Sequence, residues 1–278
     1  VLAPLLFSRQ FIHPDKCENT LLALLCFCLV SSAVYAINDI CDRQEDRKHP
    51  VKKHRPRAAG RLAVSQAVLA SILLLAAGLA LALSVNTRFL AILSIYILLN
   101  IGYSLGLKHL VILDVMIVAA GFVLRILGGS LAIQVPASHW LVLCTILMSL
   151  FLGFTKRRAE LVSLQNNQPH SRKVLKDYSI AFLDQVIAMV TGATIVCYAL
   201  YTVDTRTLDE FGSRAMLLTV PLVIYGLFRY IYLIYHLNEG QDPTASLLRD
   251  LPTIINLLLW VAVSMLVVLY GRHISLFG

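Results

Sequence analysis

The segment that decides the fold covers residues 21–46 and reads LLALLCFCLVSSAVYAINDICDRQED. It begins as an apolar run and continues into a cluster of polar and acidic side chains. An apolar helix of about 20 residues rises about 30 Å, which is the thickness of the hydrocarbon core of a bilayer. The segment therefore predicts a membrane-spanning helix that carries an acidic cluster at one end.

The rest of the chain repeats the apolar half of this pattern. Of its 278 residues, 58% are hydrophobic and 14% are charged, and the mean hydropathy of +0.75 is far above that of a soluble globular protein. The apolar runs that are long enough to span a bilayer are residues 18–38, 62–84, 88–104, 111–133, 139–155, 180–203, 214–235 and 253–271.

The opening stretch of the chain, residues 1–12, is apolar but too short to span a bilayer. Because the chain begins at Val, we interpret this stretch as the remainder of a first span. The sequence then predicts an all-α membrane bundle of about nine helices in a single domain, residues 1–278. No signal peptide is expected, because no charged region precedes a small-residue cleavage site.

Lysine and arginine predict the orientation, since cytoplasmic loops of membrane proteins carry the excess of these residues. Most of the 24 Lys and Arg residues fall in loops 38–61, 103–110, 156–178 and 236–252. These loops are therefore expected to face the cytoplasm from a multi-pass protein of the cell membrane. The net charge of +8 lies between spans, which favours anionic lipid headgroups and a phosphorylated substrate over nucleic acid.

The acidic cluster consists of Asn38, Asp39, Asp42 and Asp46, which are spaced to share one face of a helix. Stacked carboxylates repel one another, so they indicate a cation that neutralises them. Oxygen ligands suit Mg²⁺, which also binds phosphate oxygens. We predict that the four residues bind Mg²⁺ and that the three aspartates are catalytic. The alternative is a solvated helix end whose acids pair with the basic loop that follows.

That basic loop, residues 47–60, reads RKHPVKKHRPRAAG. Its two prolines exclude a continuous helix and hold the chain as a bent loop. Arginine and lysine bind phosphate oxygens well, so we predict substrate contacts from Arg47, Lys48, Lys52 and Arg55. Alternatively, the same Lys and Arg residues only set the orientation of the chain in the membrane.

The motif Asn38-Asp-x-x-Asp-x-x-x-Asp46, with Arg47-x-His49-Pro50-x-Lys52-x-x-Arg55-Pro56 after it, resembles the first motif of the UbiA-type prenyltransferase superfamily. Within that superfamily, further segments look like decaprenyl-phosphate phosphoribosyltransferases. These segments are Tyr103-Ser-Leu-Gly-Leu-Lys108 with Asp114, Gly121-Phe-x-x-Arg125, Lys156-Arg157-x-Ala159-Glu160-Leu161 and Arg172-x-x-Leu175-x-x-Tyr178. The basic segment that leads into the first helix of the family is absent from this sequence.

The resemblance implies a nine-helix bundle whose central cavity opens to the cytoplasm and sideways to lipid. It also implies transfer of a 5-phosphoribosyl group from phosphoribosyl diphosphate to a polyprenyl phosphate, with Mg²⁺ as the cofactor. The substrate-binding residues expected outside the first motif are Tyr103, Lys108, Asp114, Lys156, Arg157, Glu160, Arg172 and Tyr178.

The basic cytoplasmic loop at residues 153–178 bears on the choice of donor. Classical members of the superfamily carry a second aspartate-rich motif there, whereas this loop offers only Glu160 and Asp177 among many cations. Cations favour phosphate oxygens over a second metal cluster, so a donor with an additional phosphate fits better. Membrane topology or lipid contact is the alternative for the loop, and Glu160 is either a weak metal ligand or a salt-bridge partner.

Two features lie deeper in the predicted membrane. Arg125 shares a helix face with Asp114, about 16 Å away, and so falls near mid-membrane. Three roles for Arg125 are open from the sequence: it binds substrate, it pairs with a neighbouring acid, or it cross-links helices. The second feature is the small-residue run at 128–132, which is expected to let helices pack closely.

The six cysteines predict neither disulfides nor a metal site.

The mechanism implied by the resemblance needs no strong general base, because a polyprenyl phosphate is already anionic at pH 7. Two rival functions remain open at this point. One is a prenyltransferase that acts on an aromatic or other acceptor, and the other is a transporter of an anionic solute. The sequence leaves the oligomeric state and the length of the lipid chain open.

Overall fold

The computed structural model describes residues 1–48, 59–60, 63–165, 173–236 and 248–271, and these residues form helices and connecting turns without a strand. Eight of the helical segments are long and apolar enough to cross a membrane. Each coincides with one of the eight apolar runs, so the prediction of an all-α membrane protein is confirmed. Their bounds are 14–41, 64–85, 87–105, 113–132, 139–163, 180–203, 214–236 and 251–270.

Residues 1–12 do not form a membrane-length helix. They form the short helix α1 (Ala3–Phe7) and a 3₁₀ turn, η1 (Gln10–Ile12). A ninth spanning helix therefore stays a prediction.

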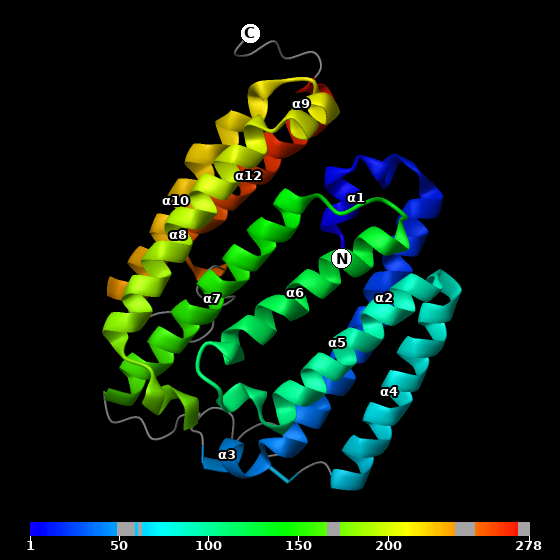
Figure 1. Ribbon diagram of the computed structural model, residues 1–278, viewed down its shortest axis with the longest axis vertical. Coiled ribbons are helices and arrows are strands. Elements are labelled where there is room, and N and C mark those ends of the chain that lie inside the picture. Colours follow the sequence, from blue (N-terminus) through cyan, green and yellow to red (C-terminus); the bar gives the residue numbers. More distant parts are fainter. Residues whose placement is uncertain (49–58, 61–62, 166–172, 237–247, 272–278) are drawn as a thin grey trace. The chain divides into compact units, whose positions relative to one another are not determined.

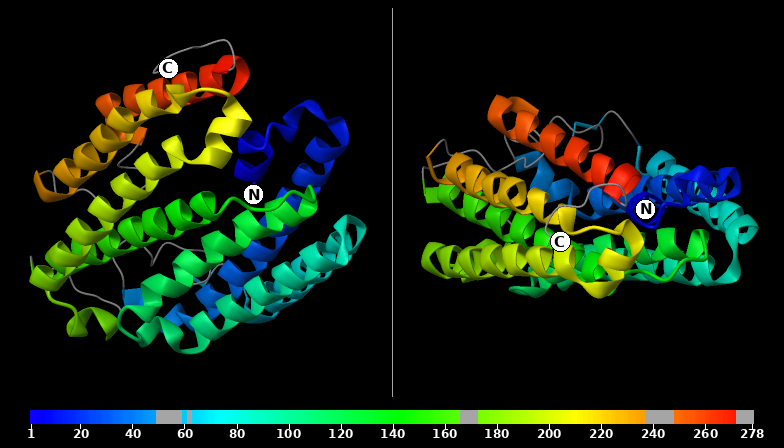
Figure 2. Two further views of the ribbon diagram at one scale, coloured as in Figure 1. Left: turned by 45° about the horizontal axis from the view of Figure 1, so that its top comes forward. Right: turned by 90° about the horizontal axis from the view of Figure 1, so that it is seen from above.

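The chain divides into two compact units, the first made of residues 1–137 and 164–177. Besides α1, this unit contains α2 (Pro14–Cys41), α3 (Arg43–Lys48), α4 (Val64–Val85), α5 (Thr87–Leu105) and α6 (Leu113–Ala132). Helix α2 packs along α4 and also contacts α5 and α6, as the views of Figure 1 and Figure 2 agree. The core of the unit is centred on Phe27, which meets Phe89 and Tyr96 edge to face.

Glycines let the helices of this unit approach closely. A Cβ atom on Gly78 of α4 would lie 2.8 Å from Val30 Cγ2 of α2. A Cβ atom on Gly128 of α6 would lie 2.7 Å from Cε2 of Phe27. Such small residues are typical of helix contacts within lipid, so the packing role predicted for Gly128 is confirmed.

Arg125 joins three helices of the first unit. Its Nη2 donates hydrogen bonds to Tyr96 Oη on α5 at 2.7 Å and to Ser31 Oγ on α2 at 3.1 Å. The guanidinium carbon also lies 4.8 Å from the centroid of the Tyr96 ring. Of the predicted roles for Arg125, these contacts support the cross-linking of helices.

The second unit, residues 138–163 and 178–278, contains most of α7 (His139–Gln165) together with α8 (Ile180–Val203), α9 (Thr205–Phe211), α10 (Val220–His236) and α12 (Leu251–Tyr270). Helix α10 contacts both α8 and α12. Polar side chains link α8 to α12 and to the 3₁₀ helix η5 (Arg214–Thr219) that precedes α10. Tyr198 Oη accepts a hydrogen bond from Trp260 Nε1 at 2.9 Å and lies 2.7 Å from Thr219 Oγ1.

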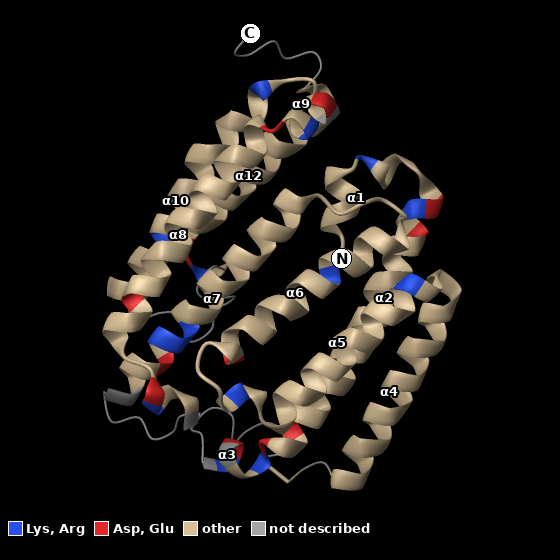
Figure 3. Cartoon of the chain, in the orientation of Figure 1, with Lys and Arg blue, Asp and Glu red and all other residues tan. Residues whose placement is uncertain are grey.

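Charged residues gather at the helix ends within each unit and leave the middle of the long helices mostly uncharged (Figure 3). This distribution is typical of helices that cross lipid. The cysteines are free in the structure, and the sulfur atoms of Cys144 and Cys197 lie 3.6 Å apart.

Candidate metal centre

The acidic cluster lies where α2 gives way to α3. Helix α2 ends at Cys41, Asp42 takes the C-cap position with φ −89° and ψ 3°, and α3 begins at Arg43. The sequence predicted one uninterrupted helix through Asp46, which is wrong at Asp42. The backbone hydrogen bonds from Asp42 N to Asn38 O and from Asp46 N to Asp42 O, both 2.8 Å, preserve the helical stacking across the break.

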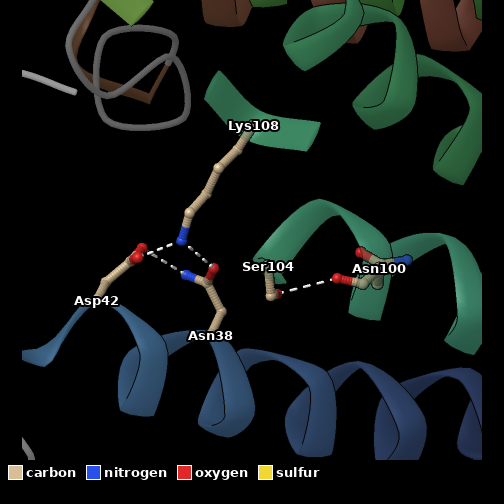
Figure 4. A network of polar contacts seen from close by, with 5 residues as sticks. All are labelled: Asn38, Asp42, Asn100, Ser104 and Lys108. Atoms are coloured by element: carbon tan, nitrogen blue, oxygen red, sulfur yellow. Dashed lines mark hydrogen bonds and ion pairs between the residues drawn. The ribbon is translucent and has the colours of Figure 1, made fainter. Parts of the chain in front are cut away.

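Three side chains meet at this end of α2 (Figure 4). The Lys108 ammonium forms an ion pair with Asp42 Oδ1 and lies 3.5 Å from Asn38 Oδ1. Asn38 Nδ2 in turn donates a hydrogen bond to Asp42 Oδ2 at 3.1 Å. The side chains of Lys108 and Asp42 are only 7% and 22% exposed, so water screens their interaction weakly.

The position of Lys108 follows from the turn between α5 and α6. The 3₁₀ turn η3 (Leu107–His109) packs against both helices. Gly106 N donates to Gly102 O at 3.2 Å, and His109 N donates to Gly106 O at 3.0 Å, so the turn has its own backbone bonds. From this fixed backbone the lysine side chain reaches across to α2.

The other predicted site residues of the first unit differ in their surroundings. Asp46 on α3 is 5% exposed, and Asp114 in the first turn of α6 is fully buried. Asp39 and Tyr103 are partly buried, and Arg47 is exposed.

No three His, Cys, Asp or Glu side chains are gathered as a metal site in the part of the chain that the structure describes. The predicted substrate residues Lys52, Arg55 and Arg172 lie outside the described residues, as does the side chain of Lys48.

The donors that do meet fit a magnesium ion chemically. Asn38 and Asp42 offer an amide and a carboxylate oxygen to one cation, which here is the Lys108 ammonium. Magnesium takes hard oxygen ligands of these two kinds and completes its shell with water and phosphate oxygens. Asp39 and Asp46, next to this pair along the chain, are the residues that would add carboxylate oxygens.

The other predicted binding residues belong to the second unit. On α7, Arg157 Nη1 donates to Glu160 Oε2 at 2.7 Å, in an ion pair whose side chains are 5% and 19% exposed. Of the two roles left open for Glu160, the structure supports the salt bridge. Lys156 is partly buried, and Tyr178 is buried with its ring centroid 6.1 Å from that of Phe182.

The sequence reasoning missed a polar cluster in this unit. Arg158 Nε on α7 and Tyr235 Oη on α10 both donate to Asp184 Oδ1 on α8, at 2.5 and 2.6 Å. The guanidinium carbon of Arg158 also lies 3.6 Å from the centroid of the Tyr235 ring. A single acid in an apolar run gives no periodic signal, and its partners are far away along the chain.

Asp250 is a second residue that the sequence reasoning missed. It accepts hydrogen bonds from Arg229 Nη2 at 2.7 Å and Nε at 3.0 Å, and it caps α12 by accepting from Thr253 N at 3.0 Å. The Arg229 guanidinium and Thr253 hold the pKa of Asp250 well below its usual value. The ion pair of Arg229 with Asp250 therefore joins α10 to the start of α12.

Comparison with known proteins shows the family. Residues 1–257 match the UbiA prenyltransferase family. Decaprenyl-phosphate phosphoribosyltransferase from Mycolicibacterium smegmatis is 31% identical over 258 residues, which cover 91% of this chain and 81% of that protein. The protein of the same name from Corynebacterium glutamicum is 32% identical over 249 residues, covering 86% of this chain and 73% of its own.

Among solved structures, a UbiA homolog from Archaeoglobus fulgidus bound to GPP and Mg²⁺ has a TM-score of 0.69 and 18% identity, covering 90% of this chain and 88% of its own. This likeness shows that the two chains share a fold. With eight membrane-length helices among its described residues and a family match over residues 1–257, the protein belongs to the UbiA prenyltransferase family of membrane transferases.

Proposed function

We propose that the protein transfers a 5-phosphoribosyl group from phosphoribosyl diphosphate to a polyprenyl phosphate, with Mg²⁺, and releases diphosphate. The observation that carries this proposal is the network of Asn38, Asp42 and Lys108, where oxygen donors and a cation meet at the end of a membrane-length helix. This combination suits a substrate that has a metal-bound diphosphate and reacts with a lipid.

The choice of donor rests on residues 153–178, which include the end of α7, and on the relatives. Glu160, the candidate ligand for a second metal ion, forms an ion pair with Arg157. Its charge is therefore already neutralised. The remaining cations of residues 153–178 favour phosphate groups, and phosphoribosyl diphosphate has a 5-phosphate besides its diphosphate. The two relatives compared above are named for phosphoribosyl transfer.

The reaction breaks the bond between the ribose anomeric carbon and the diphosphate oxygen, and it forms a bond from that carbon to an oxygen of the lipid phosphate. Negative charge grows on the leaving diphosphate while the sugar becomes oxocarbenium-like. Bound magnesium would neutralise part of that charge. Among the residues of the chain, Asn38, Asp39, Asp42 and Asp46 would hold the metal.

The cationic side chains have a different task in this mechanism. Lys108 would donate hydrogen bonds to the leaving diphosphate, and Lys52 and Arg55 are assigned the same role from the sequence. The lipid phosphate is an anion and attacks without losing a proton, so no general base is required. Arg157, Lys156 and Tyr178 are proposed to bind phosphate groups of the substrates.

The proposal includes a location. We place the protein in the cell membrane with the Asn38 end of α2 toward the cytoplasm, because the loops on that side of the predicted topology hold most of the Lys and Arg residues. A single transferase domain formed by the two units is part of the same proposal.

The proposed donor is tested by metal-dependent binding. Purified protein in detergent is titrated with phosphoribosyl diphosphate and with geranyl diphosphate, each in Mg²⁺ and in EDTA. We expect tight binding of phosphoribosyl diphosphate only in Mg²⁺, lost in Asp42→Asn and kept in Asp15→Asn. Asp15 is the matched control because it is an exposed aspartate at the opposite end of α2.

The alternative function is transfer of a prenyl group from a prenyl diphosphate to an aromatic or other acceptor. The family is named for prenyl transfer, and the structure of the Archaeoglobus fulgidus homolog was solved with bound GPP. These two observations are the reason to test the alternative. Metal-dependent binding of geranyl diphosphate, with none of phosphoribosyl diphosphate, would favour this alternative.

A further inference from the structure

Lys108 occupies the oxygens that the proposed function assigns to a metal ion. Its ammonium is paired with Asp42 Oδ1 and lies within 3.5 Å of Asn38 Oδ1. Figure 4 shows the lysine side chain extending from its own turn toward both residues of α2. An ammonium and a divalent cation repel each other, so they cannot share these two oxygens.

Release of the two oxygens requires a change in the side chain of Lys108 and none in its backbone. The backbone belongs to the turn η3, and the side chain is a flexible four-carbon stem that ends in a compact charge. The cost of leaving is electrostatic. The side chain is only 7% exposed, so an ammonium that gives up Asp42 needs another anion close by.

A diphosphate supplies that anion. With a metal ion and a diphosphate both bound, Asn38 and Asp42 would hold the metal, and the Lys108 ammonium would donate its hydrogen bonds to a phosphate oxygen. A metal ion that enters alone must break the ion pair of Lys108 with Asp42, and it brings no new anion for the ammonium.

We infer that Lys108 makes metal binding at Asn38 and Asp42 conditional on the diphosphate, so that the ion is held firmly only as a complex with substrate. This inference rests on the proposed metal site and adds a coupling between metal and substrate. Because coupling between two ligands is reciprocal, the metal must improve diphosphate affinity by the same factor.

The experiment measures binding by the melting temperature of the purified protein, since a ligand of the folded state raises that temperature. Wild type and Lys108→Met are titrated with Mn²⁺ as the metal probe, with and without inorganic diphosphate. Methionine keeps the length of the side chain and removes its charge. Lys16→Met is the matched control, because Lys16 is a lysine of α2 that lies at the end of the helix opposite the acidic cluster.

We expect wild type and Lys16→Met to bind Mn²⁺ weakly alone and at least tenfold more tightly with diphosphate. Lys108→Met should bind Mn²⁺ alone at least tenfold more tightly than wild type and should gain less from diphosphate. Lys108→Arg keeps the charge, so it should behave like wild type and shows whether a folded site has been retained.

Two results would overturn the inference. If wild type binds Mn²⁺ alone as tightly as Lys108→Met does, the lysine does not control the metal, while the proposed function stands. If no variant binds Mn²⁺ even with diphosphate, the metal site itself is wrong and both proposals fail.

Discussion

Substitution of Asp42 should have two separable effects, one on stability and one on transfer. Asp42→Ala removes the carboxylate that neutralises Lys108, whose side chain is 7% exposed. Loss of one partner of a buried ion pair costs about 3–5 kcal/mol. Because Asp42 itself is 22% exposed, water can reach the site, and we expect a loss near the lower limit, about 3 kcal/mol.

The double variant Asp42→Ala with Lys108→Met distinguishes the two effects. It removes both charges, so most of the lost stability should return, about 2 kcal/mol relative to Asp42→Ala. Neither variant should transfer the phosphoribosyl group, because the metal ligand is missing from both. The measurement is the melting temperature in detergent, where about 3 kcal/mol corresponds to a decrease of about 6 °C, together with a transfer assay on the same samples.

Two outcomes would refute this reasoning. A double variant as unstable as Asp42→Ala would show that the unpaired ammonium is not the source of the instability. Near-normal transfer by Asp42→Ala would remove the residue from the metal site, whatever the melting temperatures are.

Three further predictions concern stability. The pKa of Asp250 is lowered in the folded state, so the unfolded chain takes up the proton first as the pH falls. The melting temperature of wild type should therefore exceed that of Asp250→Asn most above pH ~4, and the difference should shrink at lower pH. A difference that does not change with pH would contradict the ion pair of Asp250 with Arg229. Tyr235→Phe keeps the aromatic ring but loses the hydrogen bond to Asp184, which should cost about 1 kcal/mol in chemical unfolding; an unchanged stability would show that this bond contributes nothing. Gly128→Ala places a Cβ atom against a phenylalanine ring of α2 and should destabilise the folded protein by about 1–3 kcal/mol. Gly192→Ala is the control, because its Cβ atom meets nothing within 4 Å, and it should be neutral or stabilising. Equal effects of the two substitutions on chemical unfolding would refute the close packing at Gly128.

Much of the fold could be predicted because lipid imposes a simple rule on sequence. A run of apolar residues long enough to cross the bilayer forms a helix, since its backbone groups must bond internally. The run 88–104, for example, corresponds to α5 (Thr87–Leu105). Helix α7 continues past its apolar run to Gln165, because its charged residues favour helix and Arg157 pairs with Glu160 one turn later.

The candidate site could be predicted only in part. Spacing along one helix places Asn38 and Asp42 together, and the structure agrees. Spacing carries no information on contacts between helices, so the ion pair of Lys108 with Asp42 and the meeting of Arg158 with Asp184 had no local signal. The helix break at Asp42 was missed for a related reason, since neither glycine nor proline marks it.

The central claim, transfer of a phosphoribosyl group to a lipid phosphate, is tested most directly by the product. Purified protein is incubated with radiolabelled phosphoribosyl diphosphate, Mg²⁺ and a polyprenyl phosphate, and the lipid fraction is analysed for label and by mass spectrometry. We expect a labelled lipid with the mass of a polyprenyl phosphoryl phosphoribose, formed by wild type and Asp15→Asn and not by Asp42→Asn. An unlabelled lipid fraction, together with prenyl transfer from a prenyl diphosphate to an aromatic acid by the same sample, would contradict it.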